Sequence, residues 1–529
     1  MSVLLALWAC TPEAPAGGSQ ASGMGTITVR GLVCDGAGQP LEGVVVSDCF
    51  KCVRTDASGA FELDSDLNVT KFVYVSIPSG YSVPVKDGLP IFYKRLSDAV
   101  SVDGCYRLEF VLDKMSKVPD RYSVLMVADP QPRPRNAGFD NIAYHSLDCC
   151  NDLYRDMRET GAAIRRSRPC YAIVLGDIVH ENMSLFDEYI KEGTSKMGFP
   201  TFNVIGNHDH RPAAKTDEEG AVPFEDRFGP TNYSFNLGKI HYIVVDNMIQ
   251  SLSSDGTLTK SENGLRDDIA GWLESDLSFV DKSATVMICS HAPLFGGTNE
   301  PYKRIRNGQV LTSALSRFHK VHSWAGHIHN SDNDSRCEMP NVESHSVVRA
   351  TGELWTNEYM SLGVPRGYVL MEVDGDDVSW KFKPTLYQTG KPVGETPAYA
   401  HRRWDYDENG VAKMKSTNET LDDSYQMNAY PKGAYGDNYV YANVFMWDEE
   451  WDLPVYISGD RREYPMTRMK DSEYRFDIGQ KELSDFYKRG WNTDFGNTFF
   501  NVFINKSTDN GMVRVKDRFG NVYTQEVKW

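Results

Sequence analysis

The chain contains 529 residues, of which 24% are charged and 12% are aromatic. This composition is typical of folded protein and excludes a largely disordered chain, and the length predicts several domains rather than one hydrophobic core. The formal net charge of -17 excludes a general affinity for nucleic acids or anionic membrane surfaces, because both partners attract dense clusters of Lys and Arg.

The N-terminal stretch MSVLLALWAC is apolar but too short to span a bilayer. It resembles the end of a bacterial lipoprotein signal peptide, in which Leu7, Trp8 and Ala9 precede a lipid-modified Cys10, although the basic n-region of such signals is missing. The following TPEAPAGGSQASG has the composition of a flexible tether. We expect a signal and tether over residues 1–22, and an exported bacterial protein, periplasmic or at the cell surface, that touches a membrane only through a lipid anchor. A frayed apolar tail is the alternative.

Residues 26 to 113 have the pattern of short β-strands, such as TITVRGLV and KFVYVSIP, separated by turn residues. The pattern GLVCDGAGQPLEGVVVSD, with VRTDASGAFEL after it, resembles the carboxypeptidase-regulatory-like β-sandwich. We expect an N-terminal β-sandwich over residues 23–117 and assign no chemistry to it.

Cysteines are frequent in the chain, and two of them form a CxxC pair. Cys49 and Cys52 in CFKC have the spacing of half a zinc site, but no second pair accompanies them, so we favour a disulfide there in an exported protein. The others are interpreted as small core residues: Cys34, Cys105, Cys149, Cys150, Cys170, Cys289 and Cys337. Pairing cannot be deduced from the sequence.

From Tyr122 the pattern changes to strands that alternate with helices. YSVLMVAD, YAIVLGD, TFNVIGN and ATVMICSH are apolar runs of strand length that each end in polar residues. Apolar or small residues recur at helical spacing from Leu147 to Ile164 and from Leu265 to Leu277. This alternation predicts a layered α/β domain, which we place at residues 118–384, closed by a hairpin in GYVLMEVDGDDVSWKFKP.

Residues 385–529 begin with a polar and aromatic stretch without clear periodicity, which we interpret as a linker. Segments such as NYVYANVFMWDEEWDLPVYISG then return to β patterning. We expect a second all-β sandwich in this C-terminal part. The sequence shows no internal repeat and no transmembrane segment.

Metal-binding residue types follow the ends of the predicted strands. They are Asp129 and Gln131 in VADPQ, Asp177 in LGDIVH, Asn207 in GNHD, His291 in CSHAP, and His327 and His329 in AGHIH. Because loops at the carboxyl ends of strands in a layered α/β fold meet at one crevice, we expect these side chains to lie together. Carboxylate, amide and imidazole ligands without thiolates suit Mn, Fe or Zn.

Two ions roughly 3.5–4 Å apart, bridged by Asp177, would grip both the attacking and the leaving oxygen of a phosphoryl transfer. A bridging water or hydroxide would become the nucleophile, so that no protein nucleophile is needed. The hypothesis is hydrolysis of a phosphomonoester or phosphodiester by attack of a metal-bridging hydroxide.

In this order, and over about residues 122–383, the five blocks resemble those of calcineurin-like metallophosphoesterases. The resemblance implies an α/β/β/α metallophosphoesterase sandwich, here flanked by N- and C-terminal all-β sandwich domains, with a dinuclear metal centre and a small phosphorylated substrate. It implies one ion held by Asp129, Gln131, Asp177 and His329, and another held by Asp177, Asn207, His291 and His327. His208 would be the second catalytic residue beside Asp177. When protonated, it would donate to the leaving-group oxygen or stabilise negative charge on the phosphoryl group, and a positioned proton donor contributes about two to four orders of magnitude in rate.

Two residues depart from the common family pattern. Gln131 stands where many members have His, and its neutral amide is a weaker ligand, so the first site would bind its ion less tightly or prefer a harder ion. His180 stands where protein phosphatase members place an Asp that orients the catalytic histidine. The absence of an Asp at position 180 leaves the charge state of His208 open and favours a substrate with a good leaving group or a diester.

The residues around these blocks supply candidates for substrate binding. His180, His210 and Arg211 flank the site and are candidate substrate contacts, and Lys303, Arg304 and Arg306 are further cations for phosphate oxygens. The remaining histidines are interpreted as core or surface residues: His145, His241, His319, His322, His345 and His401.

Two other functions remain open at this stage. One is a surface protein that binds a glycan or another partner and whose phosphoesterase domain has decayed, a reading that only Gln131 favours. The other stays within the same chemistry: a diphosphatase that cleaves the pyrophosphate bond of a nucleotide-type molecule.

Overall fold

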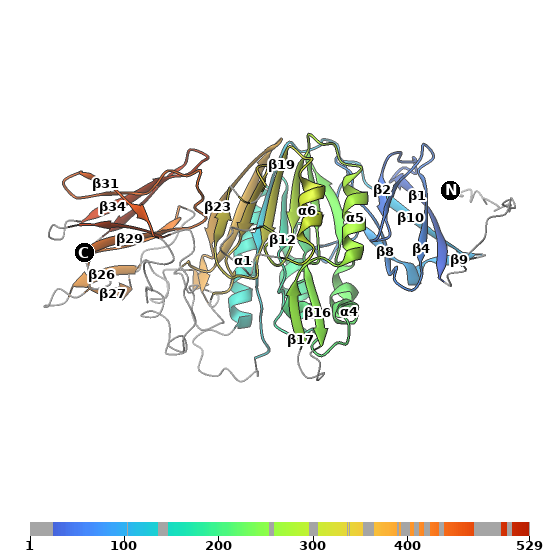
Figure 1. The fold of residues 1–529 in the computed structure, drawn as a ribbon, viewed down its shortest axis with the longest axis horizontal. Helices are drawn as coiled ribbons and strands as arrows, with labels where there is room; N and C mark the ends of the chain where they lie inside the picture. The colour runs from blue at the N-terminus through green and yellow to red at the C-terminus, as the bar shows by residue number, and fades with distance from the viewer. Residues whose placement is uncertain are drawn as a thin grey trace.

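The computed structural model places three parts of the chain in a row, an N-terminal β part, a central α/β part and a C-terminal β part (Figure 1). It describes residues 25–102, 104–135, 146–252, 259–295, 305–335, 337, 339–352, 364–388, 391–392, 402–406, 412–416, 424–432, 438–469, 499–504 and 510–527. The signal and tether expected over residues 1–22, with Cys10, lie outside these residues. No helix in the described part is both long and apolar enough to cross a membrane.

Two four-stranded sheets form the N-terminal part. One contains β4 (Ala60–Asp66), β1 (Thr26–Asp35), β10 (Cys105–Leu112) and β9 (Val100–Val102), and the other β3 (Cys52–Arg54), β2 (Val45–Ser47), β5 (Phe72–Val75) and β8 (Tyr93–Arg95). The short pair β6 (Val85–Lys86) and β7 (Leu89–Pro90) and the 3-10 turn η1 (Leu96–Asp98) complete it. Alternate residues of β4 are buried, and Phe61 and Leu63 meet Val73 and Val75 of the facing sheet in one core. The expected β-sandwich is confirmed.

All nine cysteines that the structure describes are free thiols. The expected disulfide between Cys49 and Cys52 is therefore wrong. Cys49 turns its Sγ toward the carbonyl of Phe72, 4.0 Å away, while Cys52 is buried and its backbone N–H donates to Ser275 Oγ at 2.9 Å. These cysteines serve the packing of the N-terminal part against the centre, and burial raises the pKa of both thiols.

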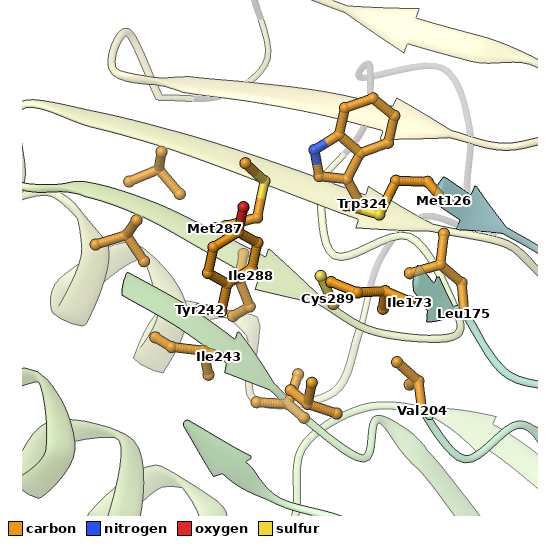
Figure 2. Close-up of a cluster of buried hydrophobic side chains, with 14 of the residues drawn as sticks. Met126, Ile173, Leu175, Val204, Tyr242, Ile243, Met287, Ile288, Cys289 and Trp324 are labelled. Carbon is orange, nitrogen blue, oxygen red and sulfur yellow. The ribbon is translucent and has the colours of Figure 1, made fainter. Parts of the chain in front are cut away.

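Two mixed sheets face each other in the central part. The first has the order β13 (Thr201–Asn203), β12 (Cys170–Val174), β11 (Arg121–Val127), β22 (Gly367–Asp374), β23 (Asp377–Pro384). The second has the order β14 (Tyr233–Leu237), β15 (Ile240–Val244), β18 (Thr285–Cys289), β19 (Lys320–Ala325), β21 (Val342–Ser346), β20 (Asp332–Asp334). Strands β11, β12 and β13 are parallel, as are β15, β18, β19 and β21. Figure 2 shows Met126 and Ile173 of the first sheet gathered with Met287 and Trp324 of the second.

Helices cover the outer faces of these sheets. They are α1 (Ser146–Ile164), α2 (Leu185–Glu188), α3 (Ser195–Met197), α4 (Asp217–Phe228), α5 (Asp267–Leu277) and α6 (Gly308–Leu315), with the π-helical turn η2 (Tyr189–Thr194) and the 3-10 turn η3 (Asn207–Asp209). Leu153 and Met157 of α1 pack on the first sheet, and Ile269 and Trp272 of α5 pack on the second, as the helical spacing predicts. The layers α/β/β/α are confirmed. A hairpin of β16 (Met248–Leu252) and β17 (Thr259–Asn263) stands beside α4.

The C-terminal part also contains two four-stranded sheets. One is formed by β28 (Met427–Tyr430), β29 (Tyr439–Val444), β33 (Phe499–Phe503) and β32 (Thr467–Arg468), the other by β31 (Glu463–Pro465), β30 (Val455–Ile457), β34 (Gly511–Lys516) and β35 (Val522–Val527). Val440, Tyr456 and Val513 share its core, so the expected β domain is confirmed. Two short pairs precede it, β24 (Tyr387–Gln388) with β25 (Lys391–Pro392) and β26 (Arg402–Tyr406) with β27 (Ala412–Ser416).

Specific polar contacts fix both β parts to the centre. On the N-terminal side, the Trp272 indole donates to Tyr74 Oη at 2.9 Å. On the C-terminal side, Arg518 pairs with Glu343 of β21 at 2.8 Å. Met446 donates its backbone N–H to Ser331 Oγ at 3.2 Å, directly after the AGHIH block. The C-terminal part therefore contacts the loop that carries His327 and His329.

Candidate metal centre

The loops after β11, β12, β13, β18 and β19 meet at one edge of the two sheets, and they bring the seven predicted ligands together. Ligand atoms of Asp129, Asp177 and His291 lie within 4.8 Å of one another. His291 Nε2 is central: it lies 3.3 Å from Asp177 Oδ1, 3.1 Å from Asn207 Oδ1 and 3.2 Å from His327 Nδ1. Residues from four separate loops thus turn oxygen and nitrogen atoms toward one point.

The other side of the cluster is formed by Asp129, Gln131 and His329. His329 Nε2 lies 3.5 Å from Asp129 Oδ1, and the Gln131 amide contacts Asp177 Oδ2. The two carboxylate oxygens of Asp177 therefore face different neighbours, Oδ1 toward His291 and Oδ2 toward Gln131. This is the geometry of a carboxylate shared between two sites.

Backbone strain marks the same positions. Asp129, Gln131, Asp177, His327 and His329 all have φ between 41° and 68°, a region that residues with a Cβ rarely adopt. Each such residue costs of order 1 kcal/mol or more, and strain of this kind persists where the surrounding structure fixes it. The loop conformations that bring the predicted ligand side chains together therefore carry a cost in backbone free energy.

Glycines next to the ligands allow the loops to pack closely. A Cβ on Gly206 would lie 2.2 Å from Asp177 Oδ1, and one on Gly326 would lie 2.5 Å from Asp129 Oδ2. Gly206 has φ -110, which lies outside the left-handed region, so the position requires glycine for the close approach of the two loops.

The buried carboxylates of the cluster need a positive charge to balance them. Asp129 and Asp177 are fully buried carboxylates, and His291 is buried against both. Burial lowers the pKa of His291, but Asp177 and Asp129 outweigh burial and raise that pKa to about 10. His291 Nδ1 donates to Leu175 O at 2.8 Å, which leaves Nε2 facing the carboxylates. Divalent cations meet the same demand, so the residues present fit a dinuclear centre.

His208 lies against this cluster and has a carboxylate partner that sequence reasoning missed. Glu181 Oε1 lies 3.3 Å from His208 Nδ1, and the His208 backbone N–H donates to Asp177 Oδ1 at 2.9 Å. Burial lowers the pKa of His208, but Glu181 and Asp177 together raise it above its usual value. Glu181, one residue after His180, is therefore a carboxylate in contact with the imidazole ring of His208.

His180 stacks on His208, with ring centroids 4.1 Å apart, and Arg133 contacts its Nε2. Burial, then the neighbouring His208, lowers the pKa of His180 to about 3, so its ring is neutral. Arg133 thus brings a guanidinium close to the candidate catalytic histidine. Arg133 follows Gln131 by two positions, but no spacing rule distinguishes it from a surface arginine.

The structure places the other substrate-contact candidates differently. His210 is buried, with Nδ1 2.9 Å from Gly206 O and Nε2 3.5 Å from Asp217 Oδ1, which points to support of the loop rather than contact with a substrate. Arg211 pairs with Glu219 on an exposed surface, and Arg306 pairs with Glu262. Lys303 and Arg304 lie outside the described residues.

Facing sheets whose strand-end loops gather carboxylate, amide and imidazole groups define a class of protein, the metal-dependent hydrolases of phosphate esters. Three family models match this chain: the N terminal of calcineurin-like phosphoesterase over residues 27–114, calcineurin-like phosphoesterase over residues 122–331, and the C terminal of calcineurin-like phosphoesterase over residues 344–523. The chain belongs to the calcineurin-like phosphoesterases. It is a hydrolase that acts on phosphoester bonds.

Solved structures with similar folds include three phosphatases or nucleotidases. A dimetal phosphatase from Danio rerio is 14% identical, with 51% of this chain and 97% of that chain covered and a TM-score of 0.36. The purple acid phosphatase PPD1 from yellow lupin is 12% identical, with 70% and 68% covered and a TM-score of 0.37. A 5'-nucleotidase from Candida albicans is 12% identical, with 76% and 91% covered and a TM-score of 0.32. No curated protein sequence matches the chain.

Proposed function

We propose that this phosphoesterase hydrolyses a small phosphomonoester or phosphodiester at the cluster of Asp129, Asp177 and His291. The observation that carries the proposal is the convergence of these buried ligand atoms within 4.8 Å, with Asn207 and His327 adjoining. Two bound divalent ions would polarise the phosphoryl oxygens and acidify a water molecule, which is the chemistry that metals supply in such reactions.

The ligands divide into two sets that share Asp177. In the proposed arrangement, Asp129, Gln131, Asp177 and His329 hold one ion, and Asp177, Asn207, His291 and His327 hold the other. The opposite directions of the two Asp177 oxygens support this division. The donor set suits Mn, Fe or Zn, and the neutral amide of Gln131 makes the first site the weaker one.

His208 donates a proton to the leaving-group oxygen in this proposal. Glu181 fixes the ring by its contact with Nδ1, and the stacked ring of His180 limits tilting. With His208 oriented in this way, the enzyme can hydrolyse substrates with poor leaving groups, such as alkyl phosphomonoesters, because the leaving oxygen receives a proton. Arg133 beside His180 favours a substrate with additional negative charge, a monoester dianion or, as the alternative, the diphosphate of a nucleotide-type molecule.

The cellular location is a separate proposal that rests on the N-terminal sequence alone. The apolar run before Cys10 and the tether after it support export and a lipid anchor, in the periplasm or at the cell surface. Mass spectrometry of the protein from its native membrane fraction tests this directly. A diacylated N-terminal Cys10 supports the anchor, whereas an unmodified Met1 contradicts it.

Replacement of ligands tests the catalytic proposal. Asp177→Ala and Asn207→Ala are expected to lower kcat/KM for nitrophenyl phosphate and bis-nitrophenyl phosphate by more than roughly 100-fold, because even changes outside the ligand set cost 10- to 100-fold. Asn151→Ala, an exposed asparagine on α1, is the matched control and should keep full activity. Unchanged turnover in both ligand variants would contradict the proposal, and the ratio of the two substrates separates monoesterase from diesterase.

A further inference from the structure

Asn207 carries its ligand atom on the short turn η3, and the carbonyls of this turn are held from behind. Gln250 of β16 donates from Nε2 to Asn207 O at 2.7 Å. His210 Nδ1 lies 2.9 Å from Gly206 O. Both carbonyls therefore have side-chain partners, while the side-chain oxygen of Asn207 lies 3.1 Å from His291 Nε2. The two contacts hold the backbone of this turn, and the backbone sets the position from which the Asn207 side chain extends toward His291.

Asp217, the first residue of α4, contacts the backbone of Gln250 and the side chain of His210. Its Oδ1 accepts the backbone N–H of Gln250 at 2.7 Å and lies 3.5 Å from His210 Nε2, while its Oδ2 accepts from Arg266 at 2.7 Å. Arg266 is held in turn by both oxygens of Asp268 at 3.2 Å. The chain of contacts thus runs from α5 through α4 and the β16–β17 hairpin to the turn of Asn207.

His210, Asp217 and Asp246 also have a spacing at which three ligand atoms could hold an ion. The contacts of the first two argue for support instead. Both nitrogens of His210 face protein partners, and the charge of Asp217 is balanced by Arg266. These contacts hold the neighbouring segments in place, and contacts outside a ligand set orient the metal ligands.

We propose that Gln250 is a positioning residue, which sets Asn207 for metal binding through the hydrogen bond from its side-chain amide to Asn207 O. The inference rests on the proposed function, because it takes Asn207 to be a metal ligand. It goes beyond that function by assigning a role to the β16–β17 hairpin, which carries no ligand itself. Asp217, which is itself held by Arg266, fixes the backbone of Gln250 through the hydrogen bond from Gln250 N–H.

Gln250→Met tests the inference, because it keeps the length of the side chain and removes the amide donor. Full-length protein is loaded with Mn or Zn, dialysed against buffered metal concentrations, and analysed for metal content. One of the two ions is expected to bind 10- to 100-fold more weakly, the range measured for contacts outside the ligand set, while the other is retained. Asn207→Ala should weaken the same ion, and the double variant should be no worse than Asn207→Ala alone.

Gln426→Met is the matched control. Gln426 is also a buried glutamine that donates to a backbone carbonyl, Phe382 O at 2.7 Å, but it lies at the junction with the C-terminal part. It should bind both ions as the wild type does. If Gln250→Met keeps both ions at wild-type affinity, or if Gln426→Met weakens the same ion to the same extent, the positioning role is wrong. A wild-type protein that binds no metal would instead overturn the proposed function.

Discussion

Glu181 Oε1 lies 3.3 Å from Nδ1 of His208. No fixed spacing rule in the sequence identifies this acid. Glu181 has φ 57, and its backbone N–H donates to His208 O at 3.0 Å, so the two residues contact through backbone and side chain. The orientation of the candidate proton donor is therefore built into the loop after β12.

Removal of this carboxylate is expected to affect substrates according to their leaving groups. Glu181→Ala should lower kcat for alkyl phosphates by roughly 10- to 100-fold, a part of the two to four orders of magnitude that a positioned proton donor contributes. Nitrophenyl phosphate should lose little, because its leaving group departs without a proton. A plot of log kcat against leaving-group pKa should become steeper in the variant.

Glu188→Ala is the control for this prediction. Glu188 is a partly exposed glutamate of α2 that pairs with Lys191 at 3.9 Å, and its replacement should leave the leaving-group dependence unchanged. An equal loss on every substrate in Glu181→Ala would show a general structural defect rather than a misplaced proton donor.

Gly206→Ala is expected to disrupt the site through a steric clash. The new Cβ would lie 2.2 Å from Asp177 Oδ1 and 2.3 Å from Asp177 N, so the backbone of one loop has to move. Overpacking of this kind costs about 1–3 kcal/mol, and here it would also displace a ligand. Metal content and kcat should both fall, measured by elemental analysis and steady-state kinetics.

Gly271→Ala provides the contrast. Gly271 lies within α5, and a Cβ there meets no atom within 4 Å. The substitution should raise the thermal midpoint slightly, because Ala is favoured over Gly in a helix by up to about 1 kcal/mol. If Gly206→Ala behaves like Gly271→Ala, close approach is not what position 206 requires.

The strand-end residues show what the sequence predicts well. Asp129, Asp177 and His291 each follow an apolar run that can only be a buried strand, so their meeting at one edge follows from the topology of parallel strands. Helix α1 is similarly evident, because its buried residues keep helical spacing.

The supporting residues could not be predicted, because their contacts depend on the fold. Gln250 and Arg133 act through contacts whose partners are a backbone carbonyl and a neighbouring ring, and neither kind of partner leaves a spacing pattern in the chain. The contact of Glu181 with His208 depends on the positive φ of Glu181, which the sequence does not reveal. The missing disulfide at Cys49 also depended on packing that only the fold shows.

Removal of metal is expected to destabilise the protein. Ions that bind the folded cluster and not the unfolded chain contribute RT ln(1 + [L]/Kd), about 2.7 kcal/mol at a free concentration 100 times Kd. The thermal midpoint should fall on addition of a chelator, rise again with Mn or Zn, and depend on the metal concentration. Asp177→Ala should respond much less than the wild type. A wild-type midpoint that is indifferent to chelator and to added metal contradicts a dinuclear site with these ligands.

Acid should weaken the junction between the central and C-terminal parts. His322 and His345 are buried there with Nδ1 and Nε2 3.2 Å apart, and they face Glu343, Lys320 and Arg518. Burial lowers the pKa of His322 to about 3 and that of His345 well below its usual value. The unfolded chain therefore binds more protons than the folded one below about pH 6.5, so stability is lost as the pH falls from there toward 3.

Asp448, which pairs with Arg518 at 3.2 Å, works in the opposite direction, because burial raises its pKa to about 6 and its protonation favours the folded state. The histidines should still dominate, since two of them titrate and their shifts are larger. Thermal midpoints measured from pH 7.5 to 5.0, with chelator in every sample to remove metal effects, should fall steadily. His322→Gln cannot become charged, so its midpoint should fall less steeply. An equal slope in wild type and His322→Gln would show that the acid sensitivity arises elsewhere.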